Sequence, residues 1–446
     1  METSPSAGRV GRRSGWIRDR GFVLGLAVIA ALGFLLRLAN AFWWLDYHIA
    51  GDSLYYYGQA NALAHGHWFV NGIDWVRTGA TEPSALHPPA YTGFLGVLSF
   101  VGAKGVSIER AASCVLGTGT IVVLGVLGRS LAGRRAGLIL ATLAAVTPGL
   151  WIADSQLLSE GLYGLALALM LLAAYRYRAR PSVLLAAGLT AAASLAALTR
   201  GEALLAFPLL VVPWIAVTVR RDPRELLRHL GVAVAVAVVL IGPWLGFNAA
   251  RFGRVTFSDN SGGTLMLTNC DATYHGDFIG YWSPTCLRRL HGNEADRDAE
   301  ARTVAIRYMR DHSSRAPVVV AARIGRLLDV YRIHQNLFLS TQLEGRGHGQ
   351  TRAQLFGFYA LVVLSIPGMA VMRRRRLRQW PLVSVALLAI FAAIVEYGNA
   401  RFRLPIEMSL DVWAAIGLAA LTVRRRAQPR VATAPTTEPV AVTTNV

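Results

Sequence analysis

The sequence predicts an all-α integral membrane protein with about ten transmembrane helices, and three observations support this. Of the 446 residues, 54% are hydrophobic and only 16% are charged, against roughly 25% in soluble domains. The apolar residues form long uninterrupted runs. The arginines cluster beside these runs, so the net charge of +19 indicates membrane topology and contact with anionic lipids. We therefore expect no nucleic-acid partner.

Ten apolar runs are long enough to cross a bilayer as helices that rise about 1.5 Å per residue. They are 21–44, 110–130, 135–152, 157–177, 182–199, 202–219, 228–247, 355–372, 381–397 and 405–423. The first run is too long for the apolar region of a secretory signal peptide, so we expect a retained helix. Residues 1–20, with five arginines, are then a basic cytoplasmic N-terminus.

One further apolar piece, 90–101, is too short to cross and begins next to the Pro88-Pro89 pair. The positive-inside rule decides its place. With ten spans and an inside N-terminus, every arginine cluster falls inside: 129–135, 176–180, 220–228, 373–376 and 424–426. If 90–101 crossed, the cluster at 129–135 would move outside. We therefore expect 90–101 to be a juxtamembrane helix that lies along the outer surface.

This topology divides the chain into a membrane core, an outer cap and two cytoplasmic ends. The core is 21–247 with its first outer loop 45–109, the extracytoplasmic cap is 248–354, the C-terminal transmembrane helices are 355–423, and the disordered cytoplasmic tail is 424–446. Amphipathic helices are expected at 294–311 and 317–330. Cys270 and Cys286 share the cap, where both a disulfide and two free thiols remain open. The expected location is the cell (plasma) membrane.

Carboxylates at the outer ends of the spans are the first candidates for chemistry, because charge near hydrocarbon is costly and needs a role or a partner. Asp52 follows the first span; partial desolvation would raise its pKa and suit it to act as a general base. The alternative is a helix N-cap. Asp46 is a second choice for the same role. Glu160, which begins another span, is either a second acid that orients the acceptor or holds a metal, or a carboxylate favoured at a helix N-terminus.

Several outer polar residues could bind an anionic substrate. Arg200 and Glu202 flank Gly201, so Arg200 either forms a salt bridge or holds a phosphate with its planar donor fork. The other candidates lie at two more outer helix ends: Asn248, Arg251, Arg401 and Arg403. The arginines depart from the positive-inside rule, which a bound lipid phosphate or contact with lipid headgroups would explain.

The sequence lacks the motifs of nucleotide and hydrolase chemistry. It contains no zinc-like His/Cys spacing, no Walker loop and no Gly-x-Ser-x-Gly elbow. A transferase working outside the cell would then need an activated, lipid-linked donor. A divalent metal is left open.

Four stretches in chain order carry a family resemblance. They are Gly51-Asp52 with Tyr56 and 60–66; His87-Pro88-Pro89-Ala90-Tyr91; Ser159-Glu160; and Pro243-Trp244 to Gly253 with 261–263 and 401–405. The chain resembles the GT-C membrane glycosyltransferases, in particular the protein O-mannosyltransferases (family 39) and the aminoarabinose transferases. The resemblance implies a GT-C fold. It also implies transfer, with inversion, from a polyprenyl-phosphate sugar donor to a protein, glycolipid or polysaccharide acceptor on the extracytoplasmic face.

The resemblance also implies roles for single residues. Asp52 would be the general base and Glu160 the second acid, with Tyr56 and His87 beside the substrate. Arg251, Arg401 and Arg403 are our own candidates for the donor phosphate. His87 departs from relatives that have Lys before Pro-Pro, so its contact would depend on pH. Two alternatives remain: a lipid or polysaccharide transporter or flippase, which predicts polar groups at mid-membrane such as Arg37, and a non-catalytic envelope scaffold.

Overall fold

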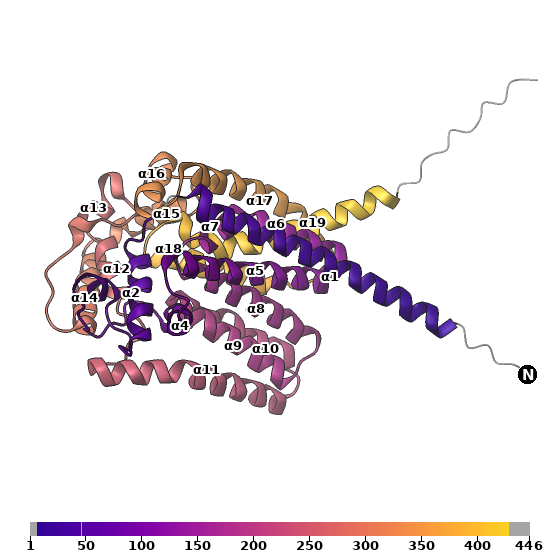
Figure 1. The fold of residues 1–446 in the computed structure, drawn as a ribbon, viewed down its shortest axis with the longest axis horizontal. Coiled ribbons are helices and arrows are strands. Elements are labelled where there is room, and N and C mark those ends of the chain that lie inside the picture. The colour runs from indigo at the N-terminus through magenta and orange to yellow at the C-terminus, as the bar shows by residue number, and fades with distance from the viewer. Residues whose placement is uncertain (1–6, 46, 428–446) are drawn as a thin grey trace, which may run out of the picture.

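The computed structural model describes residues 7–45 and 47–427 (Figure 1). Asp46 and the part of the predicted tail from residue 428 onward lie outside these ranges. The described chain is built from helices, and its one isolated β-bridge joins Val70 and Pro83. The all-α fold predicted from the sequence is therefore confirmed.

Each of the ten predicted spans forms helix. The long helices are α1 (Ala7–Ala39), α5 (Val106–Ala132), α6 (Arg134–Val146), α8 (Glu160–Ala179), α9 (Val183–Thr199), α10 (Val212–Val219), α11 (Pro223–Phe252), α17 (His348–Arg374), α18 (Trp380–Val395) and α19 (Leu404–Ala427). Short helical turns extend α1 to Trp44 and begin the α10 segment at Gly201.

Six helical segments of the described chain are long and apolar enough to cross a membrane, or seven if α6 and α7 (Pro148–Asp154) form one bent span. Helices α9 and α18 are apolar but shorter. Helix α8 begins with Glu160 and ends near Arg176 and Arg178, which reduce its hydropathy. The count of ten crossings thus stays a prediction.

Arg37, the charge predicted inside a span, has its partners at the break between α6 and α7, which meet at a bend of 58°. Pro148 begins α7 and cannot continue the hydrogen bonding of α6. At the far end of α7, Asp154 accepts a hydrogen bond of 2.7 Å from Arg37 Nε. The guanidinium also donates to the backbone carbonyls of Gly33, Ala144 and Ala145. Arg37 is fully buried and satisfied, so this charge serves packing within the bundle.

Helix α19 is the innermost of the candidate spans, with 78% of its apolar window buried. It packs on α17 through small residues. A Cβ at Gly368 would lie 1.6 Å from the carbonyl oxygen of Trp413, so only glycine permits this approach. Because α19 is held this closely, the turn just before it has a defined position.

The outer loops gather at one end of the bundle, at the left of Figure 1. They form α2 (Asp52–Ala64), α3 (Gly72–Thr78), α4 (Pro89–Phe100), α12 (Ser261–Thr268), α13 (Asp271–Tyr274), α14 (Glu294–Asp311), α15 (Ala316–Leu327) and α16 (Ile333–Leu343). Helix α4 is seen nearly end-on while α5 and α11 run across the picture, as expected for a helix lying along the surface (Figure 1). Helix α14 has its predicted bounds. Helix α15 ends three residues early, before Asp329 takes a φ of 53°.

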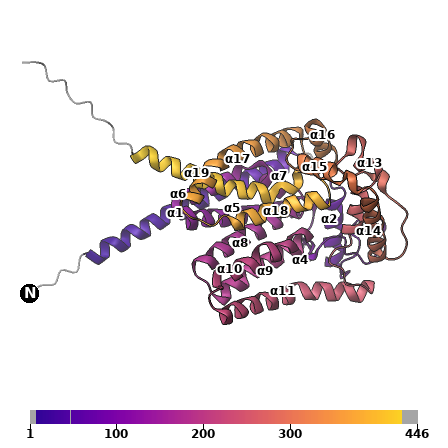
Figure 2. The ribbon, with the colours of Figure 1, turned by 180° about the vertical axis from the view of Figure 1, so that it is seen from behind.

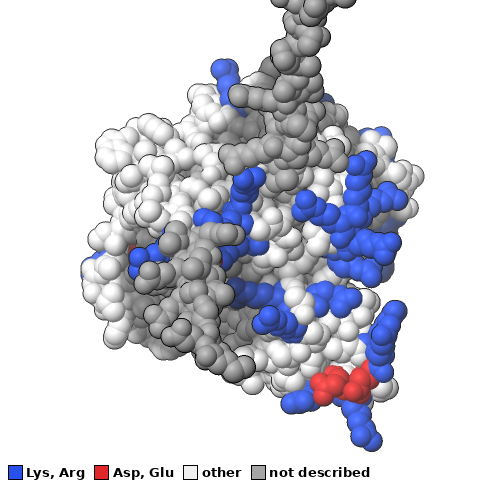
Figure 3. Space-filling view, turned by 90° about the vertical axis from the view of Figure 1, so that its right-hand side faces the viewer, with Lys and Arg blue, Asp and Glu red and all other residues white. Residues whose placement is uncertain are grey.

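The opposite end of the molecule is basic. The described parts of α1 and α19 both leave the bundle there, as Figure 2 shows from behind. Arginine side chains gather around this end, with one small acidic spot (Figure 3). Four of the arginine clusters that the sequence placed in the cytoplasm lie at the helix ends on this side: 129–135, 176–180, 220–228 and 373–376.

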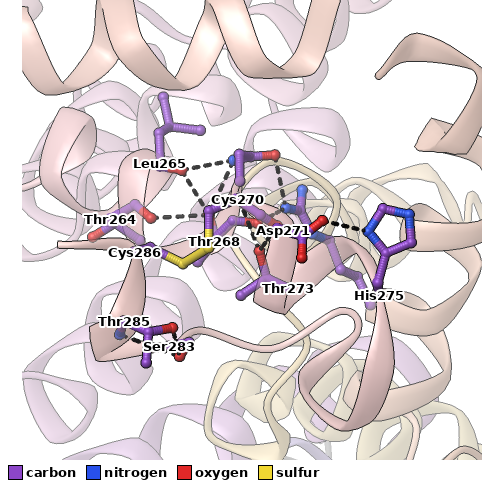
Figure 4. The surroundings of a disulfide bond; sticks show 12 residues. Thr264, Leu265, Thr268, Cys270, Asp271, Thr273, His275, Ser283, Thr285 and Cys286 are labelled. Atoms are coloured by element: carbon purple, nitrogen blue, oxygen red, sulfur yellow. Dashed lines mark hydrogen bonds and ion pairs between the residues drawn. A yellow bond between two sulfur atoms is a disulfide. The ribbon is translucent and has the colours of Figure 1, made fainter. Parts of the chain in front are cut away.

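Cys270 and Cys286 form a disulfide, which resolves the alternative left open by the sequence (Figure 4). Cys270 precedes α13 and Cys286 ends the short turn η5 (Pro284–Cys286). Nearby, Arg323 of α15 donates to the carbonyls of Thr268 and Ile394, both at 2.7 Å. The cap is thereby tied to the outer end of α18. Cys114 is free and buried in α5.

Candidate active site

A cavity of about 1100 Å³ lies between the outer ends of the spans and the cap. Its size is that of a site for a sizeable organic ligand. Six of the residues singled out in the sequence line it: Asp52, Tyr56, His87, Arg200, Glu202 and Arg401. They come from α2, the turn before α4, the start of η2 (Gly201–Leu205) with its N-cap Arg200, and the turn η7 (Ala400–Arg403).

Asp52 is the first residue of α2, after Gly51 with a φ of 53°. Gly51 occupies the N-cap position and no side chain caps this end, so Asp52 is not the N-cap. Its carboxylate instead accepts from Arg401 Nη1 at 2.9 Å, and its other oxygen lies 3.3 Å from His87 Nε2. The side chain remains 36% exposed, so one side of the carboxylate faces the cavity.

His87 is held in place by aromatic rings and by the prolines after it. Its ring stacks on Tyr56 with centroids 4.9 Å apart and meets the edge of Tyr55 at 5.2 Å. Pro88 and Pro89 begin α4, where the fixed φ of proline suits a helix start. The Pro-Pro pair thus fixes the position of His87 against Asp52.

The electrostatics of Asp52 differ from the sequence-based expectation. Burial acts to raise the pKa of Asp52, but its electrostatic interactions and hydrogen bonds with His87 and Arg401 outweigh burial and hold the pKa well below its usual value. The predicted rise in pKa is therefore wrong, because the guanidinium of Arg401 and the ring of His87 lie against the carboxylate. Asp52 is ionised at neutral pH and is a weak base.

Glu160 lies deeper, at the start of α8, and is 2% exposed. It accepts from Arg401 Nε and, at 2.8 Å, from Arg200 Nη1. Arg200 Nε also donates to Glu202 at 2.6 Å, which is the salt bridge foreseen as one alternative. The structure therefore joins Asp52 and Glu160 through a single guanidinium.

A third carboxylate of this cluster was missed from the sequence. Glu344 Oε2 lies 3.5 Å from Arg401 Nη1, and Glu344 Oε1 accepts from Asn399 at 2.9 Å. The signal that singled out Asp52, a carboxylate just outside a span, also applies to Glu344, which precedes α17. The length of the loop 248–354 concealed it.

Three other candidates do not line the cavity. Arg403 is fully buried and pairs with Asp329 at 2.9 Å and Glu407 at 2.8 Å. Arg251 donates at 2.7 Å to the carbonyl of Phe69 and to Asn248 Oδ1. These contacts hold α19 and the first outer loop in place, and they use both terminal nitrogens of each guanidinium.

The carboxylates do not form a metal centre in this arrangement. Within residues 7–45 and 47–427 there is no group of three or more His, Cys, Asp or Glu side chains that could hold a metal ion. Asp52, Glu160 and Glu344 instead surround the guanidinium of Arg401, which supplies the positive charge at their meeting point.

Comparison with known proteins shows the fold. No protein-family model and no curated protein sequence matches the chain. The oligosaccharyltransferase of Archaeoglobus fulgidus in its apo form aligns with 92% of this chain at a TM-score of 0.54 and 16% identity. The oligosaccharyltransferase AglB of the same organism, in complex with an inhibitory peptide and a dolichol-phosphate, aligns with 92% of this chain at a TM-score of 0.51 and 16% identity. ArnT of Cupriavidus metallidurans bound to undecaprenyl phosphate aligns with 91% of this chain, over 79% of its own length, at a TM-score of 0.40 and 18% identity.

The chain spans about half the length of the oligosaccharyltransferase, with 51% of that protein covered. At this identity the likeness concerns the fold and not the activity. The helical bundle with its outer cavity is thus similar in fold to a membrane-bound glycosyltransferase, and the predicted GT-C-like architecture is confirmed.

Proposed function

We propose that this protein is a membrane glycosyltransferase that takes a sugar from a polyprenyl-phosphate donor and transfers it to an acceptor hydroxyl or amine. One observation carries the proposal: Arg401, on the wall of a large cavity, joins Asp52 on the same wall to the buried Glu160, within a fold similar to that of an oligosaccharyltransferase. One of the similar structures holds a dolichol-phosphate and an inhibitory peptide, which supports a lipid-linked donor here.

Asp52 is the proposed general base, and its weak basicity defines when it acts. As the new bond forms at the sugar's anomeric carbon, the acceptor oxygen or nitrogen gains positive charge and its proton becomes acidic. The ionised carboxylate accepts that proton late in the step. Attack from the face opposite the phosphate inverts the anomeric centre, and the phosphate leaves with the electron pair of the broken bond.

The arginines of the cavity interact with the two negative groups of this step, the carboxylate of Asp52 and the departing phosphate. Arg401 fixes the orientation of Asp52, and Glu160 holds Arg401 from the other side. Glu160 is thus proposed as the residue that positions the base through Arg401. Cationic groups on the cavity wall stabilise the departing phosphate as its charge develops.

The cavity is proposed to face the extracytoplasmic side of the cell membrane. The basic end of the molecule lies opposite the cap, and arginine-rich ends remain on the cytoplasmic side (Figure 3). Single cysteines placed at Arg288 in the cap and at Arg375 in the basic end, in a variant with Cys114, Cys270 and Cys286 replaced, test this. An impermeant thiol reagent on intact cells should label the first position and spare the second.

The reaction is tested with membranes that contain the wild type, Asp52→Asn or Asp74→Asn, supplied with labelled polyprenyl-phosphate sugars. Asp74 lies on α3 of the same outer loop and forms no ion pair within the described residues, so it is the matched control. Asp52→Asn should lower transfer about 100-fold or more, the usual contribution of a general base. Equal transfer by all three proteins would reject the role of Asp52.

A further inference from the structure

Four arginines line the cavity in the described part of the chain, and three of them are paired with carboxylates. Arg200 binds Glu160 and Glu202, Arg302 binds Asp298 at 2.6 Å, and Arg401 binds Asp52 and its neighbours. The fourth, Arg346, has no carboxylate oxygen within 4.0 Å among the residues described. Its charge is available to a ligand.

Arg346 is 4% exposed, so its guanidinium has lost most of its contact with water. Nη1 donates to Gln354 Oε1 at 2.6 Å, whereas Nε is buried and has no hydrogen-bond partner. Burial lowers the pKa of Arg346, and the negative charge of Glu344 offsets this only in part. A buried, incompletely bonded guanidinium costs free energy, which an anion beside it would recover.

A second feature of the same segment favours an anion. Gly345, Arg346 and Gly347 all line the cavity, and Gly347 is the N-cap of α17, a helix of 27 residues. No side chain caps this end. The first amide groups of a helix point outward along its axis and carry partial positive charge, so they bind phosphate groups readily.

We propose that Arg346 and the first turn of α17 form a binding site for a phosphate anion. The occupant is a phosphate ester, and, resting on the proposed function, it is the phosphate of the lipid-linked donor. Arg401 is then left to hold Asp52 and Glu160, and the leaving group is received by a separate guanidinium. Glu344 connects the two sites, because it precedes Arg346 by two residues and contacts Arg401.

The test measures binding of labelled farnesyl phosphate and of inorganic phosphate to the purified full-length protein in lipid nanodiscs. The variants are Arg346→Gln, Arg346→Lys and, as the control, Arg254→Gln. Arg254 pairs with Asp296 and does not line the cavity. Arg346→Gln should weaken farnesyl phosphate binding about tenfold or more, because hydrogen bonds between charged groups are lost. Arg346→Lys keeps the charge but lacks the planar guanidinium, so its affinity for farnesyl phosphate should lie between those of the wild type and Arg346→Gln. Arg254→Gln should bind as tightly as the wild type.

Each outcome bears on the proposal. Equal farnesyl phosphate binding by wild type, Arg346→Gln and Arg346→Lys overturns it and leaves the proposed transfer reaction standing. If Arg346→Gln fails to fold, wild-type affinity in Arg346→Lys overturns the proposal by itself. If the wild type binds inorganic phosphate through Arg346 but not farnesyl phosphate, the anion site is supported and the lipid-linked donor is rejected.

Discussion

Arg401 Nη1 lies 2.9 Å from Asp52 Oδ2, although the two residues are separated by 349 positions in the chain. The contact joins the first outer helix to the turn before the last transmembrane helix. It also means that the proposed base is oriented by a group that belongs to the most buried span. This contact and three others, elsewhere in the bundle and the cap, each have a consequence that can be measured.

Replacement of Arg401 by Met should destabilise the protein by about 3 kcal/mol, because it leaves partly buried carboxylates without their shared cation. Thermal unfolding of the protein in detergent or nanodiscs measures this. The control Arg254→Met breaks an exposed pair with Asp296 and should cost less than about 1 kcal/mol. Similar losses in the two variants would contradict the view that Arg401 organises the cluster.

The pair of Arg37 and Asp154 inside the bundle should show strong coupling. Arg37→Met alone should cost about 3 kcal/mol, because Asp154 then lies buried without a partner. The double variant Arg37→Met with Asp154→Asn should recover much of that loss, since no charge remains. Unfolding of all four proteins of the cycle gives the coupling, and additive losses would refute it.

Glu294 should make the cap sensitive to pH. It accepts hydrogen bonds from Ser84 Oγ at 3.0 Å and from the Ala85 amide at 2.7 Å. Burial raises its pKa from 4.5 to about 7. A carboxyl whose pKa is raised on folding contributes full stability below its unfolded pKa and loses that contribution as the pH rises through the folded pKa. The window is therefore about pH 4.5 to 7.

The variant Glu294→Gln removes this titration while keeping the shape of the side chain. The free energy of unfolding of Glu294→Gln minus that of the wild type should therefore be more positive at pH 8 than at pH 4. Hydrogen exchange of the amides in 294–311 at several pH values reports on the cap directly. A constant difference between the two proteins from pH 4 to pH 8 would show that Glu294 does not titrate in this range.

The disulfide between Cys270 and Cys286 should stabilise the cap more than the bundle. It closes a loop with a sequence separation of 16, for which a contribution of about 3 kcal/mol is typical. In the double variant Cys270→Ser with Cys286→Ser, limited proteolysis between residues 270 and 290 should be faster. The transmembrane fragments should remain protected, and unchanged cleavage rates would argue against a stabilising role.

The sequence predicted the bundle well because its signals are local. Apolar runs, arginine clusters and the Pro88-Pro89 pair each act over a few residues, and each gave an element that the structure contains. The site was predicted less completely. Arg401 and Arg403 lie two residues apart on one 3₁₀ turn, with three residues per turn, so they face different directions. One reaches the cavity and the other is buried against Asp329, which depends on the packing of α19.

The long loop 248–354 shows the same limit. Its amphipathic helix at 294–311 could be predicted from periodicity, but the return of Glu344 and Arg346 to the cavity could not. Their position depends on contacts with a distant segment, such as those of Asn399 and Arg401 with Glu344. No local pattern encodes such contacts.

The dependence of Asp52 on Arg401 also sets an order on biosynthesis. While the chain is being made, Asp52 and Glu160 leave the ribosome long before the arginine that neutralises them, which stands just ahead of the final helix. A nascent chain halted before that helix carries these acidic groups without their main cation. The pocket is therefore completed only after the segment that contains Arg401 has been made.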